Sequence, residues 1–127
     1  MSNKTEKFTE QDAAAIRSIT DVHLQAVREH DPEAFLATCT DDIVFLPPDH
    51  AAVEGRRACR DYLEGFPTPS TFAAKFDDIE GGNDLAFSRG RATAEFDDGT
   101  TTFRWLAIFR KQPDGSWKMV RDIWNTD

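Results

Sequence analysis

The sequence predicts an α+β domain in which helices come first and an antiparallel sheet follows. Apolar residues recur with a helical period over most of the chain up to residue 66. Four runs of strand-forming residues, separated by turn sequences rich in Gly, Asp, Asn and Pro, then occupy residues 71–124. Helices grouped before such a meander pack on one face of the sheet, because each element must bury one apolar face.

The first helix is expected between Thr9 and His30. Thr9 is the expected N-cap, and Asp12 stands at the position that completes a capping box. On a helical wheel of 100° per residue, His23 falls about 20° from Ile16, near the centre of the apolar arc. The helix must turn this arc toward the sheet, so an imidazole is expected on its inner side.

A short second helix is expected to start with Asp31 as its cap and Pro32 in its first turn. Its buried stripe is expected to be Phe35, Leu36 and Cys39. The elements that follow are a strand at 43–46, a loop at 49–55 and a third helix at 56–66.

Strands are then expected at 71–79, 85–96, 101–110 and 118–124. Pairing Phe96 with Thr101 sets small residues opposite bulky rings on the inner face. Pairing Arg110 with Trp117 sets Asp122 opposite Trp105, and a slip of one residue would turn Asp122 outward. The inner face is expected to hold Phe103, Trp105, Phe109, Val120, Asp122 and Trp124. The outer face is expected to hold Leu106, Ile108, Met119 and Ile123, which predicts that a second subunit covers it.

The 127 residues fit one domain, spanning 1–127. A net charge of -8 argues against binding to nucleic acid or to an anionic membrane surface. The polar start of the chain has no apolar signal-peptide core, so a cytoplasmic protein is expected. Cys39 and Cys59 are expected to be buried, reduced thiols in helical segments. The three histidines have no metal-ligand spacing, so no metal is expected.

His23 and Asp122 are expected to face the same space, with Tyr62 of the third helix as a third member. Asp122 is either a general acid or base, or a structural carboxylate bonded to an indole, to His23 or to the backbone. Its apolar neighbours would raise its pKa, and a charged His23 would lower it. His23 either orients Asp122 or donates to a carbonyl group, or is a core histidine with one partner. Tyr62 either presents its hydroxyl to a ligand or lies at the rim.

The chain resembles the nuclear-transport-factor-2-like superfamily, in its SnoaL-like and ketosteroid-isomerase-like branch. The resemblance spans nearly the whole chain and rests on an ordered set of segments. These are residues 28–35, the strand entry at 40–45, Val53-Glu54-Gly55-Arg56, and residues 109–118 followed by Asp122-Ile123-Trp124-Asn125. The resemblance implies a cone fold, a strongly curved sheet around helices with an apolar cavity open at one end, and commonly a homodimer.

The residues that ketosteroid isomerases use are not matched. The position of their aspartate base corresponds to Pro47, that of their tyrosine donor to His23 and that of their acidic donor to Ala107. These departures argue against steroid isomerisation by that mechanism. Polyketide cyclases and epoxide hydrolases of the superfamily draw carboxylates from the late strands. Asp122 is similar in position, although the epoxide-hydrolase set is not matched.

The sequence therefore predicts a dimeric cone-fold domain that binds a small apolar molecule without a cofactor. Trp105, Trp124, Phe103 and Tyr62 are the expected walls of the site. If the protein is catalytic, the expected reaction is a proton transfer in an isomerisation, cyclisation or hydration. Asp122 would move the proton and His23 would polarise or orient. The alternative is a non-catalytic module that uses the same fold for dimerisation or for holding a partner.

Overall fold

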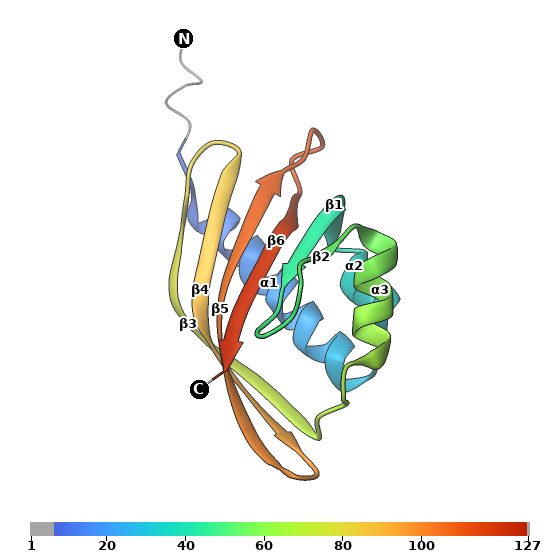
Figure 1. Ribbon diagram of the computed structural model, residues 1–127. Helices are drawn as coiled ribbons and strands as arrows, with labels where there is room; N and C mark the ends of the chain where they lie inside the picture. The colour runs from blue at the N-terminus through green and yellow to red at the C-terminus, as the bar shows by residue number, and fades with distance from the viewer. Residues whose placement is uncertain (1–6, 127) are drawn as a thin grey trace.

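The computed structural model describes residues 7–126 and has three helices and six strands within that range (Figure 1). The elements in order are α1 (Glu10–Arg28), α2 (Pro32–Leu36), β1 (Cys39–Leu46), β2 (Val53–Glu54), α3 (Arg56–Gly65), β3 (Thr71–Gly81), β4 (Leu85–Phe96), β5 (Gly99–Lys111) and β6 (Trp117–Thr126). Residues 1–6 and 127, on which the expected domain bounds and the expectation about a signal peptide rest, lie outside the described residues. No helix in the described range is long and apolar enough to cross a membrane.

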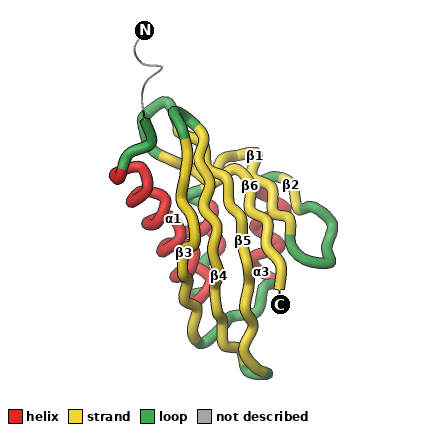
Figure 2. The backbone as a smooth tube through the Cα atoms, turned by 90° about the vertical axis from the view of Figure 1, so that its left-hand side faces the viewer, coloured by secondary structure: helices red, strands yellow, loops and turns green. Residues whose placement is uncertain are grey.

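All six strands form one sheet in the order β2-β1-β6-β5-β4-β3. The part from β3 to β6 is antiparallel, as expected, whereas β1 pairs with β6 in parallel. The long strands bend as they run (Figure 1), and all three helices lie on one side of the sheet (Figure 2). The fold is therefore the expected α+β arrangement, helices held within a curved sheet.

Both predicted helix starts are confirmed. Thr9 and Asp12 form the capping box of α1, and the Asp31 side chain accepts a hydrogen bond from the amide of Ala34 at the start of α2. His23 lies on the buried face of α1. The side chain that the helical wheel singled out therefore points toward the sheet.

The expected place of Cys39 on the buried stripe of α2 was wrong. Cys39 is the first residue of β1 and pairs with Met119 of β6, so it belongs to the sheet and not to a helical stripe. The strand expected at 43–46 thus begins four residues earlier, because pairing with β6 organises residues whose own pattern indicates no strand. Two residues of the expected loop, Val53 and Glu54, form β2 against β1.

The predicted pairing of β4 with β5 was wrong by two residues. Phe96 pairs with Gly99 instead of Thr101, because Asp97 and Asp98 alone form the turn and Gly99 has a positive φ of 139°. Each residue of β4 therefore meets a partner two positions earlier in β5 than expected. Because side chains alternate with a period of two, this shift leaves every residue on its predicted face.

The predicted pairing of β5 with β6 was wrong because a β-bulge interrupts β6. The register shifts between Ile108 and Phe109, and Val120 has no partner in the ladder. Met119 therefore faces inward opposite Phe109, and its expected place on the outer face was wrong. Beyond the bulge Asp122 still points inward, but it lies opposite Ala107 and not Trp105.

The buried side chains form two clusters with the tryptophans between them. The larger cluster surrounds Ile16, Phe45 and Phe109, and the smaller one surrounds Ala92, Ala94 and Phe103. Trp105 and Trp124 pack against both. The two indole rings therefore lie where the two clusters meet.

The close approach of β3, β4 and β5 at Gly90 predicts a strong mutational effect. A Cβ atom at Gly90 would lie 2.4 Å from the Lys75 carbonyl oxygen and 2.6 Å from Cη2 of Trp105. We expect Gly90→Ala to lower the free energy of unfolding by about 1–3 kcal/mol, because backbone cannot move aside cheaply. Gly82→Ala, where a Cβ meets nothing within 4 Å, is the matched control in urea unfolding. Equal midpoints for both variants would contradict this packing.

Candidate ligand pocket

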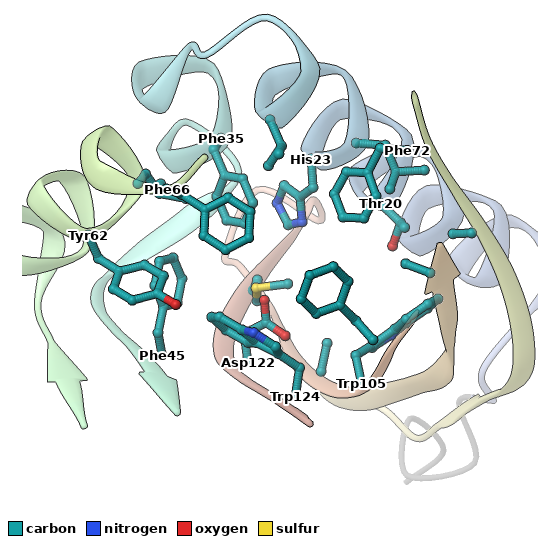
Figure 3. A pocket seen from close by; sticks show the side chains of 18 residues that line it. Thr20, His23, Phe35, Phe45, Tyr62, Phe66, Phe72, Trp105, Asp122 and Trp124 are labelled. Atoms are coloured by element: carbon teal, nitrogen blue, oxygen red, sulfur yellow. The ribbon is translucent and has the colours of Figure 1, made fainter. Parts of the chain in front are cut away.

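A largely apolar pocket of about 110 Å³ lies between the helices and the inner face of the sheet (Figure 3). The six residues predicted as site residues all line it, which brings together side chains from α1, α3, β5 and β6. The lining residues are Thr20, His23, Leu24, Val27, Phe35, Phe45, Tyr62, Leu63, Phe66, Phe72, Ala74, Ala92, Phe103, Trp105, Ala107, Met119, Asp122 and Trp124. The carboxyl group of Asp122 and the imidazole of His23 therefore face a mostly apolar space from opposite sides, with Thr20 and Tyr62 as the other polar lining residues.

Asp122 lies at the centre of the sheet, with Ala107 beside it on β5 and Phe45 beside it on β1. Its side chain is half-buried and lines the pocket. Within residues 7–126 its carboxyl group has no hydrogen bond or ion pair, so none of the three structural partners considered for it holds it. Burial among apolar neighbours raises its pKa from the ordinary 3.8 to about 7.

His23 is only 7% exposed and is fixed by two contacts that the sequence did not indicate. Its Nε2 atom lies 2.6 Å from Oγ1 of Thr38 in the turn before β1. Its ring stacks on Phe35 with centroids 3.8 Å apart. Desolvation lowers its pKa to about 3, so the imidazole is neutral at physiological pH. His23 is therefore uncharged and does not lower the pKa of Asp122, which is shifted by desolvation alone.

His23 and Asp122 do not bond to each other. Each points into the pocket, from α1 and from β6 respectively (Figure 3), and no hydrogen bond joins them. The two groups therefore line one pocket without forming a preformed hydrogen-bonded dyad. Thr38 was missed because it lies in a turn, where no periodicity marks a residue as facing inward.

The walls are aromatic rings that support one another. The indole of Trp124 meets Phe45 and Tyr62 edge-on, both at centroid distances of 5.9 Å. The indole N–H of Trp105 donates to Oγ of the buried Ser88 at 3.0 Å, so this donor is not directed at Asp122. Burial, with the nearby charge of Asp122 second, raises the pKa of Tyr62, so its phenol stays protonated.

The cysteines take no part in the pocket. Cys39 and Cys59 are buried and unpaired, and burial raises the pKa of their thiols to about 12 and about 11. They are therefore thiols and not nucleophilic thiolates at neutral pH. Among the described residues, no three His, Cys, Asp or Glu side chains gather where they could hold one metal ion.

Ala107 of β5 lies directly opposite Asp122 of β6 and carries only a methyl group. From the resemblance, its position is expected to correspond to the acidic donor of the ketosteroid isomerases. In the structure the carboxyl group beside this position comes from the neighbouring strand, β6.

The sequence matches the family model of the SnoaL-like domain over residues 21–120, so the chain belongs to this family. No functionally curated protein matches it. Several solved structures share the fold, which is the NTF2-like cone, also called cystatin-like.

Three of these structures illustrate the range of the fold. A ketosteroid isomerase-like protein from Erwinia carotovora atroseptica is 23% identical with a TM-score of 0.79, over 93% of this chain and 98% of the other. A putative ketosteroid isomerase from Parabacteroides distasonis is 21% identical with a TM-score of 0.72, over 86% and 83%. A protein of unknown function from Nostoc punctiforme is 17% identical with a TM-score of 0.86, over 95% of both chains. At these identities the likeness shows the fold alone.

Asp122 and His23 should affect stability with opposite dependence on pH. The folded protein holds the pKa of Asp122 above its ordinary value, so it binds more protons than the unfolded chain between pH 3.8 and about 7. The contribution of Asp122 therefore falls as the pH rises through this window. The pKa of His23 is lowered from 6.5 to about 3, so its contribution falls as the pH drops through that interval.

We therefore expect Asp122→Asn to match the wild type in stability near pH 4 and to exceed it at pH 8. The gain in the free energy of unfolding should be on the order of 2–4 kcal/mol. A pKa shift of about three units sets the upper end of this range. The lower end allows for solvent that reaches the carboxyl group through the pocket and screens it. Urea unfolding at a series of pH values measures it, with the exposed turn variant Asp98→Asn as control. A difference that stays constant with pH, or a less stable variant at pH 8, would contradict the shifted pKa.

Proposed function

We propose that the protein binds a small, single-ring, mostly apolar molecule and that Asp122 exchanges a proton with it. The observation that carries this proposal is an acid without a protein partner, held in an aromatic pocket. An isolated carboxyl group in such a setting costs stability, as does any buried polar group that lacks a partner. A chain that keeps one there gains either a ligand contact or a proton-transfer group.

The size of the pocket supports a one-ring ligand. Pockets for drug-sized molecules typically measure about 300–1,000 Å³. Apolar cavities of about 150 Å³ bind molecules as small as benzene. The volume of this pocket, about 110 Å³, is close to that of the cavities that bind benzene. This favours a ligand much smaller than a steroid, in agreement with the unmatched positions Pro47 and Ala107.

The chemistry of Asp122 supports proton transfer. A general acid or base is most effective when its pKa lies near the working pH, and that of Asp122 is about 7. The carboxylate would take a proton from a carbon next to a carbonyl group, leaving the electron pair on the enolate oxygen. The carboxylic acid so formed would then return the proton at the same or another carbon. Isomerisation and cyclisation use this step, and a carboxyl group performs it without a cofactor.

Cyclohexanone provides a one-ring test of this proposal. In D₂O at pH 7 we expect the wild-type protein to speed deuterium exchange at the carbon beside the carbonyl group, measured by NMR. Asp122→Asn should reduce this rate by a factor of about 10²–10⁴, the usual contribution of a general acid or base. Asp98→Asn is the control.

Two results separate the parts of the proposal. If Asp122→Asn retains the rate, Asp122 is not the proton-transfer group. If the wild type gives no exchange but toluene shifts the indole resonances of Trp105 and Trp124, the catalytic half fails and the binding half stands. If toluene also leaves these resonances unchanged, the proposed ligand class is wrong.

The outer face of the sheet supports a second proposal, that two copies of this chain associate through it. Leu46, Ile123 and Leu106 are partners across β1, β6 and β5, so they form one continuous row. They are 37%, 40% and 39% exposed. An apolar row at the centre of a sheet is typical of a self-complementary interface.

We expect Leu106→Glu to convert a dimer to a monomer, because two-fold symmetry brings the new charge close to its own copy. Light scattering during size-exclusion chromatography measures the mass. Leu85→Glu, at an exposed apolar residue outside this row, should leave the mass unchanged. A wild-type protein that is monomeric, or a Leu106→Glu variant that stays dimeric, would overturn the interface.

A further inference from the structure

The contacts of His23 determine which of its ring nitrogens carries the hydrogen. Oγ1 of Thr38 lies 2.8 Å from the carbonyl oxygen of Phe35 and donates its single hydrogen there. The same oxygen lies 2.6 Å from Nε2 of His23, and its hydrogen is already used. Nε2–H of His23 is therefore the donor in that bond, and the hydrogen bonds run in one direction from His23 through Thr38 to Phe35.

The second nitrogen of the ring is left as a bare acceptor. A neutral imidazole carries one N–H, so Nδ1 holds only a lone pair once Nε2 is protonated. Nδ1 has no hydrogen-bond partner within residues 7–126, although the side chain is more than nine-tenths buried. No polar side-chain atom in that range is both closed off from solvent and unpaired. Nδ1 is therefore accessible to solvent, and His23 lines the pocket (Figure 3).

We infer that the pocket selects ring compounds that carry a hydroxyl or N–H group, and that this group donates a hydrogen bond to Nδ1 of His23. Thr38 sets this preference because it fixes the tautomer of the His23 ring. The inference rests on the proposed function and names the polar group that its ligand must have. It reverses the sequence-based hypothesis that His23 donates to a carbonyl group. Thr38 touches no ligand in this account and is a positioning residue.

The preference bears on which substrate the proposed proton transfer would take. Removal of a proton from a ring ketone leaves an enolate oxygen, which carries no hydrogen to donate to Nδ1. The hydrogen bond to Nδ1 must therefore come from a second group on the ring, a hydroxyl or an N–H. A substrate that suits both side chains has its acidic carbon at Asp122 and this donor at His23.

Phenol, anisole and toluene test the inference, because they share a ring and differ in the hydrogen-bond donor. We expect phenol to bind at least about tenfold more tightly than anisole, the factor that one ordinary hydrogen bond supplies. Calorimetry, or the shift of the Trp105 and Trp124 indole resonances, measures the affinities. Equal binding of phenol and anisole would overturn the inference while leaving the proposed function intact. If none of the three binds, the proposed function and the inference both fail.

A second measurement reads the tautomer without any ligand. The ¹⁵N spectrum of the imidazole should show His23 protonated at Nε2 and bare at Nδ1 in the wild type. Thr38→Val removes the acceptor and should shift the population toward the other tautomer while reducing the preference for phenol. Thr38→Ser keeps a hydroxyl group and should restore both.

The exposed variant Thr100→Val is the matched control and should change neither property. A wild-type ring protonated at Nδ1 would overturn the inference outright. A Thr38→Val variant that folds and keeps the wild-type tautomer and phenol preference would overturn the role of Thr38.

Discussion

The bulge at Val120 is the constraint on which the rest of the site depends. Met119 and Asp122 are three residues apart, so in a regular strand they would face opposite sides of the sheet. The unpaired Val120 lets both point inward, Met119 against Phe109 and Asp122 beside Ala107. The same segment pairs in parallel with β1, which holds Phe45 against the other side of Asp122. Bulges commonly re-aim a side chain in this way next to a functional site.

The bulge places Asp122 in the same apolar pocket that His23 enters from the buried face of α1. Desolvation acts on each in the direction that removes its charge, raising the pKa of Asp122 and lowering that of His23. The pair is thus uncharged over much of the acidic range, and Asp122 becomes charged only near neutrality. His23 receives structural support from Thr38 and Phe35, whereas Asp122 receives none within the described residues. The fold fixes the imidazole and leaves the carboxyl group available to a ligand.

Much of this could be predicted from the sequence, and the reasons for the misses are physical. Helical periodicity and strand alternation were strong enough to give the order of elements and to place His23 and Asp122 on the inner surface. The pairing partner of Asp122 on β5 was not predictable, because the bulge at Val120 leaves no pattern in composition. The two-residue turn at Asp97 and Asp98 shifted the partners of β4 in the same unforeseen way. Thr38 escaped notice because its role depends on a hydrogen bond to a residue fifteen positions away.

The resemblance sets Ala107 at the position expected for the acidic donor of the ketosteroid isomerases, and Asp122 stands directly across from it on β6. The pocket therefore has a carboxyl group beside this position, although residue 107 carries none. On the opposite wall, the resemblance sets His23 at the position expected for a tyrosine donor. Both departures concern the polar groups, while the other lining residues are mostly apolar.

Asp122 stands without a protein partner among the described residues, in a mostly apolar pocket. An NMR titration of its carboxyl carbon, assigned by comparison with Asp122→Asn, tests this directly. We expect a midpoint near pH 7, which should move when phenol fills the pocket. A midpoint near the ordinary value of 3.8 would show that water or a protein group already solvates the carboxylate, and would contradict the account.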